Sequence, residues 1–360
     1  MKEKILILAN NSSGLYSFRK ELIRELAKKY CVWASTPDDG RVSQLEEIPC
    51  KVMPISMDRR GVNPIKDMGL MVRYFRLLAA VKPNFVMTYT IKPNIYGGIV
   101  CRLKKIPYGV NITGLGTAFQ KEGFLKKIVT LLYKVALKDA KTVYFENAQN
   151  RDLFLELKIV KQEQCCLLHG AGVNLQQYTL LEYPKESEKL RFLFIGRVMQ
   201  EKGVDELFSA MKMLHKENKN CVLDVVGSLE ENYSEKIAVY EKEGWLTYHG
   251  FQEDVHPFIE KAHCFVLPSW HEGMANTNLE CAASGRPVIT SDIWGCKEAV
   301  IENETGFLCR SQDALSLYEA MKKMAELSGE QREQMGCAGR VHMEAVFDRE
   351  RVVQETMKRL

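Results

Sequence analysis

The sequence predicts an α/β protein made of two Rossmann-like, doubly wound domains that face a cleft. Its 360 residues exceed the usual size of a single hydrophobic core. Short apolar runs alternate with helical patterns, as they do in a parallel sheet with crossover helices. This alternation starts again near residue 190, after a charged stretch without periodicity. The restart predicts a second sheet.

The first predicted domain covers residues 1–175. Its predicted strands are the apolar runs KILILA, CVWAST, FVMTYT, YGVNIT and KTVYFEN. The segment SFRKELIRELAKKY, between the first two runs, has the spacing of an amphipathic helix.

The second predicted domain covers residues 190–345, and the linker before it is expected at residues 176–190, which combine charge and a proline without a clear period. Its predicted strands are RFLFIG, CVLDVVG, LTYHG, CFVLPS and PVITSD, and VDELFSAMKMLHKEN predicts a helix after the first of them. From about Leu315 onward only helical patterns follow.

Composition excludes several classes of protein. Apolar residues make up 46% and charged residues 27% of the chain, as in an average soluble globular protein. The opening run MKEKILILAN is too short for a signal sequence or a membrane span, so we expect a cytoplasmic protein without a transmembrane helix. The eleven cysteines show no C-x-x-C spacing, which favours reduced thiols over a zinc or redox site.

Charge is distributed unevenly. Residues 1–180 hold 28 Lys and Arg against 15 Asp and Glu, whereas the remainder holds 22 against 31. A basic first half indicates an anionic partner, either a membrane surface, a phosphorylated lipid or a nucleic acid. Ordinary variation of surface charge would give the same count. A nucleic acid is disfavoured because no binding module or basic–aromatic alternation is present.

The first motif with chemical potential is RFLFIGRVMQEKGVDELF, in which a strand ends at Gly196 and a helix begins near Val204. Arg197 and Lys202 lie in the connecting loop. This edge of a doubly wound sheet binds phosphate groups because unpaired amides and the helix dipole favour negative charge. The two cations could neutralise a diphosphate, or they could be ordinary solvated residues.

The second motif is PSWHEGMANTNLECAASGRPVITSDIWGCKEAV, where Glu272 precedes a helix and Glu280 lies on it. Gly273 allows a close backbone approach, and Asn276 or Thr277 is the expected N-cap. Several amides could therefore converge on one anion or sugar. The alternative is a solvated pair of glutamates at an ordinary helix start.

Together these motifs resemble glycosyltransferase family 4 of the GT-B fold. Its G-R-x-x-x-x-K-G and E-x(7)-E signatures correspond here to Gly196–Gly203 and Glu272–Glu280, and PVI, GCKEAV and ENETGFL extend the likeness. The resemblance implies that Arg197 and Lys202 bind the donor diphosphate and that Glu280 binds the ribose hydroxyls. It implies that Glu272 holds the transferred sugar, with the amides of Met274 and Ala275 nearby, and that no side chain acts as a nucleophile.

The resemblance also has consequences for the rest of the chain. The glycine-rich loop of the family corresponds to Gly14, and its spacing departs from the G-x-G-x-x-G of a dinucleotide dehydrogenase. Where many members have a histidine, VNITGLGTAF has Thr113. A C-terminal helix, residues 346–360, is expected to pack back on the first domain. Because no metal-binding spacing of histidines and no D-x-D is present, we expect neither metal nor cofactor.

Two helical patterns in the basic half predict a membrane-facing surface. At 100° per residue, Lys66, Arg73 and Arg76 fall within an arc of about 80°. Lys126, Lys127, Lys134 and Lys138 fall within about 120°. Seven such charges would suffice for reversible docking on anionic lipid. The alternative is that the apolar faces of these helices pack on the sheet and the basic residues only face water.

The sequence thus predicts a retaining transferase that moves a hexose or N-acetylhexosamine from a UDP-sugar to an undecaprenyl-diphosphate-linked or similar lipid acceptor. Strings such as TYTIKPNIYG and NITGLGTAF resemble the branch of the family that builds surface polysaccharides. The expected place of action is the inner face of the plasma membrane. Two alternatives remain, a nucleotide-sugar 2-epimerase and a nonenzymatic membrane-associated subunit of a transferase.

Overall fold

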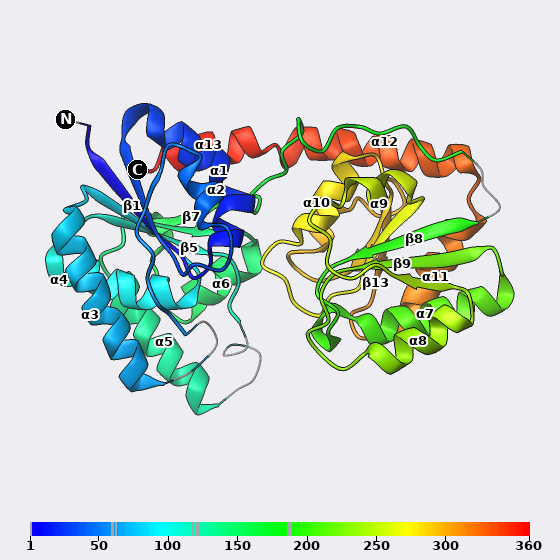
Figure 1. Ribbon diagram of the computed structural model, residues 1–360, viewed down its shortest axis with the longest axis horizontal. Coiled ribbons are helices and arrows are strands. Elements are labelled where there is room, and N and C mark those ends of the chain that lie inside the picture. Colours follow the sequence, from blue (N-terminus) through cyan, green and yellow to red (C-terminus); the bar gives the residue numbers. More distant parts are fainter. Residues whose placement is uncertain (1, 59–60, 62, 117–118, 120–122, 186–188) are drawn as a thin grey trace. The chain divides into compact units, whose positions relative to one another are not determined.

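The computed structural model describes residues 2–58, 61, 63–116, 119, 123–185 and 189–360. The chain divides into two compact units, residues 1–171 with 350–360 and residues 172–349 (Figure 1). The segment expected as a linker, residues 176–190, therefore belongs to the second unit. The last eleven residues belong to the first unit.

The first unit contains a sheet of seven parallel strands in the order β3-β2-β1-β4-β5-β6-β7. The five predicted strands are present, and two short strands at the sheet edges, β3 and β7, were not predicted. The strands are β1 (Lys4–Leu8), β2 (Cys31–Ser35), β3 (Lys51–Val52), β4 (Phe85–Tyr89), β5 (Tyr108–Ile112), β6 (Thr142–Phe145) and β7 (Cys165–Leu167).

Helices cover both faces of this sheet. One face packs on α3 (Pro64–Val81), η1 (Pro93–Gly97), α4 (Gly98–Lys104), α5 (Phe124–Leu137) and α6 (Ala148–Glu156). The other packs on α1 (Ser12–Lys29), α2 (Val42–Glu46) and the C-terminal α13 (Arg349–Met357), which contributes Val353 to the core. A short turn, η3 (Gln162–Gln164), leads into β7.

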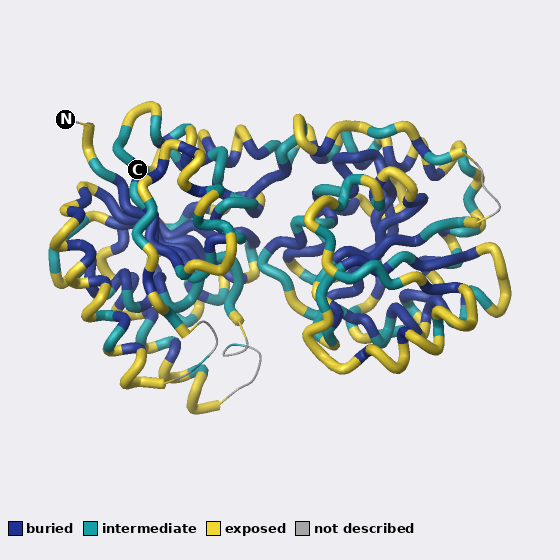
Figure 2. The backbone as a smooth tube through the Cα atoms, in the orientation of Figure 1, coloured by how far each residue is buried: buried dark blue, intermediate teal, exposed yellow. Residues whose placement is uncertain are grey.

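The second unit contains six parallel strands in the order β10-β9-β8-β11-β12-β13. They are β8 (Leu190–Ile195), β9 (Cys221–Val226), β10 (Leu246–Tyr248), β11 (Cys264–Leu267), β12 (Val288–Ser291) and β13 (Gly306–Cys309), of which β13 was not predicted. The helices are η4 (Gln200–Lys202), α7 (Val204–Glu217), α8 (Ser234–Lys242), α9 (His256–Lys261), α10 (Asn276–Ala283), η5 (Lys297–Ala299), α11 (Ala314–Glu326) and α12 (Gly329–Val346). In each unit the strands form the buried centre (Figure 2).

A buried arginine fastens the expected linker to the second unit. Arg286 is fully covered, and its guanidinium donates to the carbonyl oxygens of Ile259 at 2.8 Å and Glu182 at 2.9 Å. The Tyr183 hydroxyl donates to the carbonyl of His263 at 2.8 Å. Because a buried guanidinium must satisfy its donors, residues 181–183 are held in place even though their sequence shows no period.

All eleven cysteines have unpaired thiols, and only Cys337 among them is exposed. Burial raises the pKa of the Cys50 and Cys101 thiols to about 12. Because the thiolate is the reactive form, these buried cysteines are chemically inert in the folded chain.

Candidate active site

The candidate site lies where the strand order of the second sheet reverses. β8 pairs with β9 on one side and with β11 on the other, so the connections that follow β8 and β11 run in opposite directions. Lys202 lies in η4 after β8, and Glu272 lies in the loop after β11. The crevice outside such a reversal is where doubly wound sheets bind their ligands.

The two residues meet in an ion pair. The ammonium of Lys202 donates to Oε1 of Glu272, and Ser269 Oγ donates to the same oxygen at 2.8 Å. The side chains are only 18% and 13% exposed. A lysine and a carboxylate are therefore held together, largely shielded from water.

Gly203 brings the two loops into contact. Its φ of +72° lies in the left-handed region, and a Cβ at this position would come within 2.0 Å of the Pro268 carbonyl oxygen. The Trp270 amide donates to the Glu201 carbonyl at 2.9 Å. Only glycine fits this approach, which places Lys202 and Glu272 on adjoining backbone segments.

A second glycine supports the segment after Glu272. Gly295 accepts a hydrogen bond from the Ala275 amide at 2.7 Å, and its φ is +88°. A Cβ there would lie 2.7 Å from the carbonyl oxygens of Glu272 and Gly273. The side chains of Met274 and Ala275 are buried in the core of the second unit.

The start of α10 differs from the prediction. The N-cap is Ala275 without a side-chain cap, so the expectation that Asn276 or Thr277 caps the helix is wrong. The hydrogen bond to Gly295 already fixes this turn, and both residues lie in the first helical turn. The first-turn amides of a helix have no acceptor within the helix, so they point out of its N-terminal end and can donate to a ligand there.

Glu280 is carried by α10, as predicted, and is half-buried. Burial raises its pKa to about 7, while the charge of Arg349 and a hydrogen bond with Tyr178 oppose the shift. A carboxyl group that is easily neutralised near pH 7 is typical of a binding site rather than of a solvated surface.

The remaining predicted residues of the second unit lie beside this centre. Gly196 follows β8, and Arg197 is exposed and forms no ion pair with the described residues. The structure thus joins Lys202 to Glu272 but does not join Arg197 to either of them. An exposed arginine at a strand end can still reach an incoming phosphate.

Gly14 and Thr113 belong to the first unit. Gly14 lies in the first turn of α1, where the Asn11 side chain accepts a hydrogen bond from its amide, so the expectation of a glycine-rich loop is wrong. The capping asparagine starts the helix two residues before the glycine. Thr113 is half-buried in the bend after β5.

The predicted basic residues lie on two helices of the first unit. Lys66, Arg73 and Arg76 are exposed on α3, and Lys127, Lys134 and Lys138 are exposed on α5 or directly after it. Lys126 is half-buried, unlike these three lysines, and its part in a membrane-facing surface stays a prediction. On the helical wheel Lys126 falls within the arc that packs on the sheet, between Tyr133 and Leu137.

Two other features are absent from the residues that the structure describes. No group of three or more His, Cys, Asp or Glu side chains there could hold a metal ion. No helix there has the length and apolar character needed to cross a bilayer.

Comparison with known families covers both units. Residues 181–342 match the family described as Glycosyl transferases group 1, and residues 4–147 match Glycosyl transferase 4-like. The Thermosynechococcus elongatus sucrose-phosphate synthase has the same fold, with a TM-score of 0.80 at 19% identity over 99% of this chain and 98% of that one. Anabaena HepE, in complex with UDP and glucose, also gives 0.80, at 15% identity over 99% and 98%. Both family models describe glycosyl transferases, and both solved structures share the arrangement of two doubly wound parallel sheets, so the resemblance and the predicted fold are confirmed.

Three curated relatives have names that specify the sugar transfer more closely. The chain is 27% identical to the N,N'-diacetylbacillosaminyl-diphospho-undecaprenol alpha-1,3-N-acetylgalactosaminyltransferase of Campylobacter jejuni, over 90% of this chain and 89% of that protein. It is 23% identical to the capsular polysaccharide biosynthesis glycosyltransferase CapM of Staphylococcus aureus, over 98% and 95%. It is 27% identical to the UDP-Gal:alpha-D-GlcNAc-diphosphoundecaprenol alpha-1,3-galactosyltransferase of Escherichia coli, over 74% and 73%.

Two residues that shape the site were not predicted. The sequence indicates Ser269 only as the end of the apolar run CFVLPS, yet its hydroxyl donates to Glu272. The string GCKEAV contains Gly295 and indicates no role for it, yet the backbone of residues 272–275 approaches this glycine closely. A serine that ends a strand just before a polar loop, and a glycine between two hydrophobic segments, are signals that could have indicated both.

Proposed function

We propose that this protein transfers a sugar, a hexose or N-acetylhexosamine, from a UDP-sugar to a lipid-diphosphate-linked acceptor, with the anomeric configuration kept. The observation that carries the proposal is the Lys202–Glu272 pair at the reversal between β8 and β11. Two relatives are named for diphospho-undecaprenol-linked sugars and one of these for UDP-Gal, which supports both substrate classes. CapM supports a role in surface-polysaccharide assembly.

The cations act on the leaving group. As the bond between the sugar and the phosphate breaks, negative charge grows on the departing diphosphate. Lys202 supplies a point charge, Arg197 a planar fork of donors, and the first turn of α7 unpaired amides. Since the charge is larger in the transition state than in the bound donor, these groups lower the barrier, and each such donor is worth about 3–4 kcal/mol.

The glutamates position the donor. Glu272 accepts hydrogen bonds from hydroxyls of the transferred sugar while it keeps Lys202 beside the diphosphate. Glu280, as a carboxylate, accepts from the ribose hydroxyls. The proton of the acceptor hydroxyl passes to an oxygen of the leaving diphosphate, so the step needs no side chain as nucleophile or base. No metal ion takes part in this proposal, because lysine, arginine and amides supply the positive charge.

We place the acceptor at the inner face of the plasma membrane, since a lipid-linked sugar must be met at a bilayer. The excess of Lys and Arg in the first half of the chain supports this location.

A panel of UDP-sugars tests the proposal. The true donor should raise the temperature of thermal unfolding, because a ligand that binds only the folded state stabilises it. With a lipid-diphosphate-linked acceptor the enzyme should release UDP and form a product whose anomeric proton shows the donor configuration by NMR. Rapid UDP release without acceptor would indicate an epimerase instead, and an inverted product would contradict retention.

A further inference from the structure

The outer side of α3, α4 and α5 exposes an unusual amount of apolar surface. Of the nineteen large apolar side chains that are exposed among the described residues, ten lie on these three helices. α3 and α5 both pack on η1 and α4 within one layer of the first unit (Figure 1). In the second unit the exposed apolar side chains are scattered over many elements. A gathered apolar surface of this kind marks an interaction site.

On α3 the exposed apolar residues form a stripe separate from the core. Ile65, Met68, Val72 and Phe75 fall within an arc of about 80° at 100° per residue. Residues that pack on the sheet, such as Leu70 and Tyr74, occupy the opposite side. The predicted basic residues lie between these two arcs. α3 therefore has one apolar face for the core and a second that faces solvent.

α5 repeats the arrangement. Phe124, Ile128, Leu131 and Val135 fall within about 60°, opposite the buried Val129 and Tyr133 that join the core. Lys127, Lys134 and Lys138 border this stripe on one side. We call the two stripes, together with the exposed Leu103 of α4, the α3–α5 surface.

The cations beside this surface are mostly not neutralised by the protein. Arg73, Arg76, Lys127, Lys134 and Lys138 form no ion pair with the described residues. Lys104 lies 3.8 Å from the centroid of the Phe75 ring and covers part of it. A second copy docked by two-fold symmetry would bring like charges together, whereas an anionic lipid surface would compensate them.

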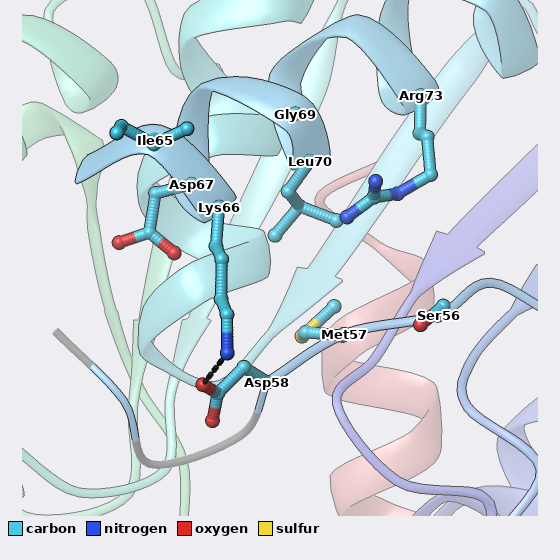
Figure 3. A pocket seen from close by; sticks show the side chains of 9 residues that line it. All are labelled: Ser56, Met57, Asp58, Ile65, Lys66, Asp67, Gly69, Leu70 and Arg73. Carbon is cyan, nitrogen blue, oxygen red and sulfur yellow. Dashed lines mark hydrogen bonds and ion pairs between the residues drawn. The ribbon is translucent and has the colours of Figure 1, made fainter. Parts of the chain in front are cut away.

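A pocket opens at the margin of the α3–α5 surface. Its volume is about 510 Å³, and Lys66 and Arg73 extend from α3 on either side of Leu70, above Met57 (Figure 3). Lys66 pairs with Asp58 at 3.4 Å, which leaves Arg73 available to an anion. Cations beside an apolar wall suit the headgroup of an anionic phospholipid.

We propose that the α3–α5 surface docks on an anionic bilayer by inserting its apolar stripes among the lipids, with the flanking cations at the headgroups. This inference rests on the proposed function for its biological reason, because a lipid-linked acceptor is presented at such a surface. It differs from docking by charge alone. Charge alone is released by salt, whereas inserted apolar side chains are not screened.

Vesicle sedimentation tests the insertion. The intact protein is mixed with vesicles of phosphatidylcholine containing about 30% phosphatidylglycerol, at low salt and at about 1 M NaCl. We expect binding at low salt and substantial binding at high salt. The variant I65S/M68S/F124S/L131S should bind about ten-fold or more weakly at either salt concentration. Ile65 and Phe124 are 82% and 80% exposed, so folding should not depend on them.

Three controls sharpen the result. The variant F251S/L315S/V341S removes exposed apolar side chains from the second unit and should bind vesicles like the unmodified protein. In F124W the new indole should be quenched by lipids brominated in the acyl chain, relative to the signal of the four native tryptophans. The new indole of L315W, in the second unit, should not be quenched by the same lipids.

Several outcomes would overturn the proposal. These are no vesicle binding, complete release at high salt, equal binding of the serine variant, or an indole of the F124W variant that stays unquenched in bound protein. A dimer that dissociates in the serine variant, without vesicle binding, would assign the surface to self-association. Transfer to an acceptor in detergent should survive in the serine variant. If the unmodified protein binds vesicles but shows no transfer activity, the result would count against the proposed function and not against docking.

Discussion

Replacement of Gly203 by alanine tests whether the two site loops must touch. The new Cβ would lie 2.0 Å from the Pro268 carbonyl oxygen, whereas an ordinary contact is about 3.5 Å. The loops after β8 and β11 must therefore separate by about 1 Å or more. A displacement of 1 Å between catalytic groups costs about 100-fold in rate. We expect kcat/KM for UDP release to fall by about that factor, because Lys202 and Glu272 lie on these two loops.

Gly244→Ala is the matched control. Gly244 also has a left-handed backbone, with φ of +81°, but a Cβ there would meet no atom within 4 Å. Both variants carry the backbone cost of about 1–2 kcal/mol for a left-handed non-glycine residue. Only Gly203→Ala adds a collision in the site. The melting temperature of each variant, read by fluorescence, separates lost stability from lost catalysis. A Gly203→Ala enzyme as active as the Gly244→Ala enzyme would refute the requirement for contact between the loops.

Four further predictions concern charge in the site. Lys202→Ala and Arg197→Ala should each lower kcat by about 100-fold or more with unchanged circular dichroism, because each leaves the charge of the leaving diphosphate less compensated. Near-normal turnover in either would exclude that residue from the diphosphate site. Glu280→Gln should chiefly weaken donor binding and Glu272→Gln should chiefly lower kcat, as titration and steady-state kinetics would show; identical KM effects would contradict the division of roles. Burial raises the pKa of Glu280 to about 7, so its protonation stabilises the fold at acid pH, and this stability is lost as the pH rises from about 4.3 through 7. Melting temperatures of Glu280→Gln should therefore vary less with pH in this window than those of the unmodified protein. Full activity in EDTA is expected for a site whose positive charges come from side chains and amides, and activity that returns only with a divalent cation would contradict this.

The arrangement of elements was largely predictable from local pattern. β8 and α7 were predicted nearly to the residue, because a strand buried on both faces gives a continuous apolar run and a helix after it changes the period. β3 and β7, with two and three residues, were missed because such short strands contain too few residues to show a pattern. β13 was missed because its four residues follow a polar turn and show no long apolar run.

The geometry of the site was predictable only in part. The motifs placed Lys202 and Glu272 in loops at strand ends, but they are 70 positions apart in the chain. Which loops adjoin depends on strand order, and local periodicity does not contain strand order. The prediction for the N-cap of α10 was wrong for a related reason. The Ala275 amide donates to the carbonyl of Gly295, which belongs to a later segment of the chain.

The exposed stripes illustrate another limit of periodicity. A 100° period indicated a basic stripe beside apolar residues on α3 and α5, and the alternative interpretation placed these apolar residues on the sheet. α3 instead has two apolar arcs, and its sequence gives no reason to assign Leu70 to the core and Met68 to the outside. Only the packing of the folded chain separates them.

The cysteines allow the folded state of this protein to be monitored by alkylation of its thiols. With ten thiols shielded to different degrees and Cys337 open on α12, brief alkylation of the native chain should modify chiefly one position, whereas alkylation in denaturant should modify eleven. The mass shift of the labelled chain then counts how many molecules have opened during the labelling pulse. The same handle would carry a fluorophore at a defined place on the second unit without any engineered residue.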